Sequence, residues 1–177
     1  MSSFLQSKTN RIILGTVLLM GCFLAFRWTS SSQLEKQQAE LMSGIEDARW
    51  GRCESGISEN YLDRWGWNRL DLIAVFKDVR SQFLVLGIHF DNPVWDIADR
   101  KATMVAHIRL EGTPLGVGSE IQRMVKREKS PLTFSWEKES WTHWSWRLVR
   151  MDHPELEIPD SYTPGDLVKA RKGQFSF

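Results

Sequence analysis

Apolar side chains recur at a helical spacing in the middle of the chain. Over residues 64–83 they return every three or four positions, which predicts an amphipathic helix whose apolar stripe is buried against a sheet. The stripe consists of Leu72, Phe76, Val79 and Phe83, widened by Ile73 and Val75. The opposite, polar side carries Asp71, Lys77, Asp78 and Arg80.

Further along the chain the apolar positions alternate with period two, which is the spacing of a strand with one buried face. A first strand is predicted over residues 84–90, and Asn92-Pro93 then interrupts it as a turn or bulge. The clearest strand covers residues 101–111, because five apolar side chains share one parity there. These side chains are Ala102, Met104, Ala106, Ile108 and Leu110.

The second half of the domain is predicted to be strands alone. Gly112-Thr113-Pro114 marks a turn, after which residues 117–127 are predicted to form a weaker, more polar strand. Two long strands follow and form a hairpin, in which aromatic side chains pair across the strands. One face of the first carries Leu132, Phe134 and Trp136, and one face of the second carries Trp144, Trp146 and Leu148.

The flanks of this region differ from its centre. Residues 33–50 are rich in strong helix formers but carry few apolar ones, at Leu34, Leu41 and Ile45. This pattern predicts a polar stalk helix, or one that lies lightly on the domain. Residues 154–177 contain three prolines and few apolar residues, which predicts an extended tail. The plan is a stalk helix and linker over residues 29–62, an α+β domain over 63–153 and the tail.

A short apolar segment precedes the domain. Residues 12–26 contain no charged side chain and are bracketed by Arg11 and Arg27. A helix of this length spans about 22 Å, and Arg27 with the interfacial Trp28 extends its reach across a bilayer. Because basic residues predominate before the segment, the domain is expected outside the cytoplasm, which is the periplasm in a Gram-negative bacterium. We expect a cytoplasmic leader over residues 1–11 and a membrane anchor over residues 12–28.

Two alternatives to an uncleaved helix stay open. A charged start followed by an apolar run is also typical of a secretory signal peptide. Leu19-Met20-Gly21-Cys22 resembles the cleavage box of bacterial lipoproteins, in which the cysteine becomes the lipidated N-terminus. Cys22 is then the lipidation site. The apolar run continues past Cys22 to Phe26, which favours the uncleaved helix.

Composition and charge narrow the classes of function. Lys8, Arg11 and Arg27 flank the apolar segment, so 20 of the 23 basic residues remain in the rest of the chain, against 22 acidic ones. A slightly acidic domain without a basic stripe has no general attraction for phosphate backbones, and nucleic-acid binding is not expected. Cys53 is the single cysteine after the apolar segment, so no disulfide forms within the exposed part of the chain.

The order of elements carries a family resemblance. An amphipathic helix, an interrupted strand and three antiparallel strands, closing with Trp144-Ser145-Trp146-Arg147-Leu148-Val149-Arg150, resemble the nuclear transport factor 2-like, or cystatin-like, cone over residues 63–153. The resemblance implies an α+β fold in which helices pack on the concave side of a strongly bent antiparallel sheet. The fold hosts enzymes, ligand binders and purely structural subunits.

Enzymes of this family set a His–Asp pair, or an Asp with a Tyr, inside the cone. Here the positions of apolar parity carry no group that exchanges a proton, so we expect no enzyme and no cofactor. These side chains either fill the core or form a pocket for an apolar or aromatic ligand. They are Met104, Ile108, Phe134, Trp136, Trp144 and Trp146.

A leader, one membrane helix, a stalk and a cone also resemble the inner-membrane scaffold subunit of type IV secretion systems. That family carries an Asn-Pro-x-Gly motif, of which Asn92-Pro93-Val94-Trp95 keeps the first half. The resemblance implies proteins of a membrane complex as partners.

Polar residues of the strands offer weaker candidates. His89, His107 and His143 are expected as solvated surface side chains and not as a metal site. The polar parity of the last two strands predicts an outer sheet face that is either solvated or pairs two protomers. It comprises Thr133, Ser135, Glu137, His143, Ser145 and Arg147.

Taken together, the residues favour a membrane-tethered, non-enzymatic interaction or scaffold domain outside the cytoplasm. Binding of a small apolar or aromatic ligand in a tryptophan-lined cone is the alternative. An enzyme of lyase or isomerase type is the third hypothesis.

Overall fold

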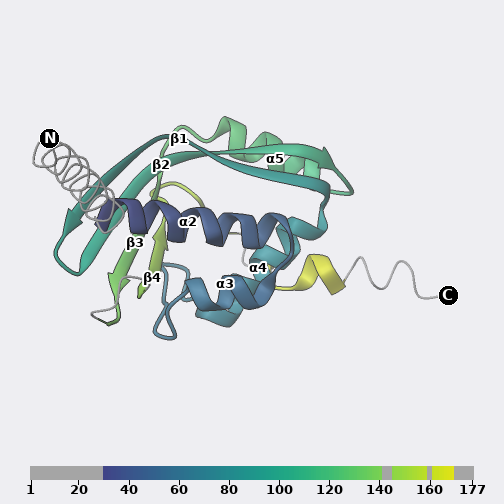
Figure 1. The fold of residues 1–177 in the computed structure, drawn as a ribbon. Coiled ribbons are helices and arrows are strands. Elements are labelled where there is room, and N and C mark those ends of the chain that lie inside the picture. The colour runs from purple at the N-terminus through teal and green to yellow at the C-terminus, as the bar shows by residue number, and fades with distance from the viewer. Residues whose placement is uncertain (1–29, 141–144, 159–160, 170–177) are drawn as a thin grey trace, which may run out of the picture.

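Helices and a curved antiparallel sheet form one α+β structure, as the sequence predicts (Figure 1). The computed structural model describes residues 30–140, 145–158 and 161–169. The sheet has the strand order β1-β2-β3-β4, and α2, α3 and α4 lie together on one side of it. In chain order the elements are α2 (Ser30–Glu46), α3 (Trp50–Gly56), α4 (Arg69–Ser81), β1 (Phe83–Ala98), β2 (Lys101–Pro114), α5 (Gly118–Arg127), β3 (Leu132–Lys138) and β4 (Trp146–Asp152).

The leader, the anchor over residues 12–28 and the lipidation site Cys22 lie outside the described residues. Within the described ranges, no helix combines the length and the apolar character needed to cross a membrane.

Helix α2 is not a stalk. Leu34, Leu41 and Ile45 are at most 2% exposed, and the helix lies across the sheet (Figure 1). Met42, at 9% exposed, joins them, and these four apolar residues form the single stripe that faces the core while the other side of the helix stays polar. The carboxylate of Glu46 also accepts a hydrogen bond from the backbone N–H of Ile88 at 2.7 Å, which ties the end of α2 to β1.

Helix α4 forms where the apolar spacing predicts it. The Asn68 side chain accepts hydrogen bonds from the N–H groups of Leu70 and Asp71, and Asp71 accepts one from Asn68, so a capping box starts the helix. Leu72 and Ile73 are buried on its inner face. Asp78, predicted on the polar side, is instead fully buried.

The residues after β4 cover Asp78, so the prediction of an extended tail is wrong for residues 161–169. The Asp78 carboxylate accepts hydrogen bonds from the Tyr162 hydroxyl at 2.8 Å, the Gly165 N–H at 2.8 Å and the Val168 N–H at 2.9 Å. The last two donors belong to a turn and a short helical segment that the carboxylate caps. Burial raises the pKa of the Tyr162 hydroxyl above its ordinary value.

Strands β1 and β2 confirm the predicted interruption and alternation. The register between them shifts from Asp91 to Val94, and Asn92 takes the left-handed conformation with φ of 51°. On β2, Ala102, Met104 and Ala106 are buried on one face, as their shared parity predicts.

Residues 118–127 form helix α5 and not a strand. A side chain at Gly118 would lie 2.1 Å from the Gln82 carbonyl oxygen, which also accepts a hydrogen bond from the Leu115 N–H. The chain therefore turns tightly against the end of α4 before α5 begins. Ile121 and Val125, four residues apart, then share one helix face.

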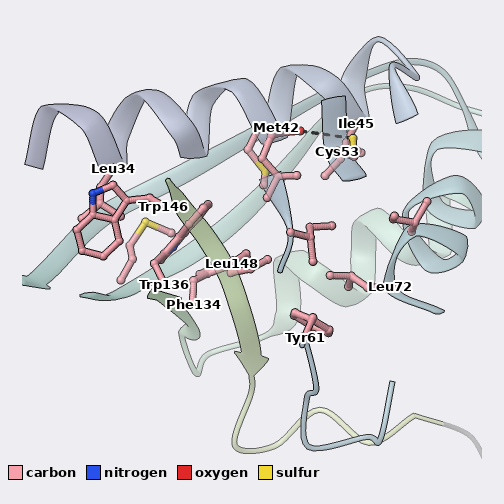
Figure 2. Close-up of a cluster of buried hydrophobic side chains, with 14 of the residues drawn as sticks. Leu34, Met42, Ile45, Cys53, Tyr61, Leu72, Phe134, Trp136, Trp146 and Leu148 are labelled. Atoms are coloured by element: carbon pink, nitrogen blue, oxygen red, sulfur yellow. Dashed lines mark hydrogen bonds between the residues drawn. The ribbon is translucent and has the colours of Figure 1, made fainter. Parts of the chain in front are cut away.

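Aromatic side chains of β3 and β4 form the centre of the core (Figure 2). Phe134 and Trp136 from β3 and Trp146 and Leu148 from β4 are at most 2% exposed. The Phe90 ring meets Phe134 edge to face at 5.5 Å. The concave side of the sheet is thus packed with its own side chains under the helices.

We expect Asp78→Asn to release the segment over residues 161–169. The asparagine amide replaces one acceptor oxygen by an NH₂ group, which cannot accept the hydrogen bonds that the carboxylate accepted. The free energy of unfolding should therefore fall by about 1–3 kcal/mol. Limited chymotrypsin digestion with mass spectrometry should show faster cleavage after Tyr162. The matched control is Asp96→Asn, at an exposed carboxylate of β1. Equal cleavage rates in the two variants would contradict the capping role.

Candidate functional site

The structure buries the side chains that the sequence proposes as a ligand-pocket wall. Met104, Phe134, Trp136 and Trp146 lie in the core at most 2% exposed, and Figure 2 shows the Trp146 ring close beneath Leu34 of α2. The remaining two candidates are Ile108, which is half-buried, and Trp144, which lies outside the described residues.

The indole N–H groups of Trp136 and Trp146 are buried and have no hydrogen-bond partner among the described residues. Both tryptophans therefore contribute to the core through apolar area.

A separate cavity lies where α5, β2, the start of β3 and the segment after β4 meet. Its volume is about 170 Å³, and we call it the α5 pocket. The walls are mainly apolar, with polar groups at a few points. The apolar side chains are Ile108, Met124, Val125, Leu132 and Leu156, and the polar residues are His107, Glu128, Ser130 and His153.

His153 is the fully buried polar residue of this pocket. Its Nδ1 atom accepts hydrogen bonds from the backbone N–H groups of Glu155 at 3.2 Å and Leu156 at 2.8 Å. Nδ1 therefore carries no proton, and Nε2 donates to the Ser130 carbonyl at 2.9 Å. Both ring nitrogens form hydrogen bonds with backbone groups. The imidazole therefore joins the α5–β3 connection to the segment after β4.

The Glu128 carboxylate lies 3.7 Å from His153 Nε2, which would be the geometry of a His–carboxylate pair. The same carboxylate accepts hydrogen bonds from the N–H groups of Lys129 and Ser130. Because His153 and Glu128 both bond to backbone groups, the pair has the character of a structural clamp and not of an acid–base pair presented to a substrate.

The loop before α4 holds the pocket's C-terminal wall in place. The Arg64 guanidinium donates to the carbonyls of His153 and Pro154, and the Trp65 indole N–H donates to the Leu156 carbonyl at 3.3 Å. These bonds join a loop to a segment that lies about ninety residues later in the chain.

Asp63 shapes that loop. Its carboxylate accepts hydrogen bonds from the Trp65 N–H at 3.0 Å, the Trp67 N–H at 2.9 Å and the Tyr61 hydroxyl at 3.1 Å. Burial raises the pKa of the Asp63 carboxyl above its ordinary value, and burial also raises the pKa of the Tyr61 hydroxyl. The Asp63 carboxylate therefore stabilises its own turn.

The outer face of the sheet carries charged side chains in pairs. Arg109 on β2 contacts Asp91 on β1 at 3.2 Å and also pairs with Glu111, while His89 Nε2 lies 3.3 Å from the Glu111 carboxylate. Such half-exposed pairs contribute little to stability, about 0–1 kcal/mol each. They do give this face a balanced pattern of opposite charges.

The other predicted polar candidates are dispersed. His89 and His107 are exposed, whereas His143 lies outside the described residues. No cluster of three or more metal-ligating side chains occurs in the described part of the chain. Thr133, Ser135, Glu137 and Arg147 are half-buried on the outer parity, but Ser145, predicted with them, is 6% exposed and donates to the Ser140 carbonyl.

Cys53 is a buried packing residue. It lies between α3 and α2, where a side chain at Gly44 would come within 2.9 Å of its Sγ atom. Burial raises the pKa of the Cys53 thiol to about 11, which keeps it from being a nucleophile at neutral pH.

Asp63, Asp78 and His153 organise the structure although no sequence pattern marked them as functional candidates. Asp63 had a local signal, because an aspartate followed at short distance by Gly66 is typical of a turn stabilised by its own side chain. Asp78 had none, since the Tyr162 hydroxyl lies 84 residues away in the chain. His153 has two nearby partners, the N–H groups of Glu155 and Leu156, but its bond to the Ser130 carbonyl joins residues 23 positions apart.

The comparison with known proteins identifies the fold. No protein-family model matches the sequence, and neither does any curated protein sequence. Solved structures do match. One is an NTF2-like (nuclear transport factor 2-like) protein from Cytophaga hutchinsonii. It has a TM-score of 0.50 and 10% sequence identity, and the match covers 71% of this chain and 97% of that protein. The chain has a nuclear transport factor 2-like fold.

Two further solved structures are similar to this chain. A variant of Rv3472 from Mycobacterium tuberculosis, a protein of unknown function, has a TM-score of 0.51 and 11% identity over 82% of this chain and 94% of its own. Bd1075 from Bdellovibrio bacteriovorus has a TM-score of 0.52 and 12% identity over 71% of this chain. The match spans 41% of Bd1075, less than half of its length. At these identities the similarity establishes the nuclear transport factor 2-like fold alone.

We expect His153→Ala to lower the free energy of unfolding by about 2–3 kcal/mol, because two backbone N–H groups and one carbonyl lose their partner in a buried place. Urea denaturation followed by circular dichroism measures the change. His107→Ala, at the exposed histidine of the same pocket, is the control and should stay within about 0.5 kcal/mol of the parent. Similar losses in both variants would contradict the clamp assigned to His153.

Proposed function

We propose that this chain is a membrane-held, non-enzymatic interaction domain that pairs through the outer face of its sheet. The observation that carries the proposal is the packed concave side, where Trp136 is 1% and Trp146 0% exposed. An enzyme of this fold needs room and an acid–base group there.

The buried polar groups support the same conclusion. Asp63, Asp78 and His153 each use their polar atoms to hold backbone N–H groups of the chain itself. A proton-transfer residue instead needs an atom within hydrogen-bond reach of a substrate.

The membrane part of the proposal rests on the sequence. Residues 12–26 form an uncharged apolar run between Arg11 and Arg27, which suits a single-pass anchor with the domain outside the cytoplasm. A lipidated Cys22 would tether the domain to the same membrane.

The outer sheet face supports the interaction part. Val105 lies at the centre of this face, opposite Val94 on β1 and Thr133 on β3 in the strand register. Around it the charges alternate in sign, as in the pairs of Lys101 with Glu137 and of Arg150 with Asp152. A face with balanced charges around an apolar centre is suited to meet a second copy of itself about a two-fold axis, and proteins of a membrane complex are the further candidates.

The test begins with membranes from cells that express the full chain. We expect the chain to stay in the membrane pellet after carbonate washing and, once solubilised, to have the mass of a dimer by size exclusion with light scattering, after subtraction of the micelle. Val105→Arg should give a monomer, because like charges would face each other across the two-fold axis.

Leu70→Arg is the matched control, since Leu70 is 68% exposed on α4, away from the sheet, and this variant should remain a dimer. Recovery of the chain in the carbonate supernatant would contradict the membrane part. A monomeric parent chain at micromolar concentration, or a dimer that persists in Val105→Arg, would contradict the pairing.

A further inference from the structure

The α5 pocket has the size of a small-ligand site. Its volume of about 170 Å³ is close to that of an apolar cavity of about 150 Å³ that binds benzene in another protein. A single six-membered ring or a short branched alkyl group therefore fits, and a fused-ring or long-chain molecule does not. Its walls of Ile108, Val125 and Leu132 offer such a group apolar contact on several sides.

A polar hollow lies beside the pocket along α5. This second hollow has a volume of about 290 Å³ and shares Met124 and Glu128 with the pocket. Arg123 and Arg127 also line it. An occupant of the pocket can thus extend a polar group toward the guanidinium groups of α5.

The charged side chains around the polar hollow that have no ion-pair partner among the described residues are positive. Glu120 pairs with Arg123, and Glu128 is bound to backbone N–H groups next to His153. In the part of the chain that the structure describes, no hydrogen bond or ion pair involves the side chains of Lys126, Arg127 and Lys129. Of these three, Arg127 lines the hollow itself.

We propose that the α5 pocket binds a small anionic amphiphile, namely a carboxylate that carries one aromatic ring or a short branched alkyl group. The apolar part occupies the α5 pocket, and the carboxylate lies in the polar hollow and pairs with Arg127. His153 serves as a rigid part of the wall. This site goes beyond the proposed pairing function, because Val105 belongs to neither hollow.

The experiment uses the full chain in phosphatidylcholine nanodiscs and follows 4-fluorophenylacetate by ¹⁹F NMR, with empty nanodiscs as the blank. We expect saturable binding at one site per chain. The neutral 4-fluorobenzyl alcohol should bind about two- to five-fold more weakly, which is the contribution of an exposed ion pair.

Three variants locate the site. Arg127→Gln should weaken binding of the acid about two- to five-fold and leave binding of the alcohol unchanged, because only the acid makes the ion pair. Met124→Glu should weaken the acid about tenfold or more, since it removes an apolar wall and adds a like charge. Met124 is 57% exposed, so the fold should survive, as a thermal melt would check. Arg52→Gln, at an exposed arginine of α3, is the matched control and should bind both probes like the parent.

Binding no stronger than to empty nanodiscs would overturn the proposal. It would also be overturned if acid and alcohol bound equally, or if Arg127→Gln bound the acid like Arg52→Gln. The Val105→Arg variant should bind the acid like the parent, so failure of this site and failure of the outer-face pairing are told apart.

Discussion

The packing of Trp136 and Trp146 beneath α2 is the interaction on which the rest of the structure depends. An indole buries about 200 Å² of largely apolar surface, worth about 5 kcal/mol at the usual rate per unit area. Leaving its N–H without a partner costs about 1–3 kcal/mol. The free energy gained by burying each ring therefore exceeds the cost of its unpaired N–H group, which has no partner among the described residues. The concave side of the sheet becomes a core that is filled by the protein's own side chains.

Once the interior is filled, buried polar groups at its margin hold the chain together. Asp78 caps the short helical segment near Val168, and Asp63 closes the turn before α4. His153 joins the residues directly after β4 to the connection between α5 and β3. Each satisfies backbone N–H groups that would otherwise be unpaired away from water. The α5 pocket lies outside the tryptophan core. Its shape depends on the hydrogen bonds that His153 makes to the backbone at its wall.

The sequence predicts those parts of the fold whose signals are local. The alternation along β2, the interruption at Asn92 and the helical stripe around Leu72 each follow from side-chain period and turn chemistry, and the structure confirms them. The prediction fails at α5 because Ile121, Met124 and Val125 suit a polar strand about as well as a helix, and the close approach of Gly118 to Gln82 is a tertiary contact. It fails at α2 because its apolar residues are too sparse in the sequence to distinguish a covered stripe from a free helix. The α5 pocket was not predictable, since its walls come from four segments whose proximity no local pattern encodes.

Hydrogen exchange of the tryptophan indole groups tests the filled interior most directly. In ¹⁵N NMR spectra of the full chain, assigned with single Trp→Phe variants, we expect the Trp136 and Trp146 N–H signals to exchange only through opening of the core, because both side chains are at most 1% exposed. Their signals should stay in place when 4-fluorophenylacetate is added. Exchange as fast as that of a half-buried indole such as Trp50, or a ligand-dependent shift of either signal, would show a hollow cone and contradict the filled core.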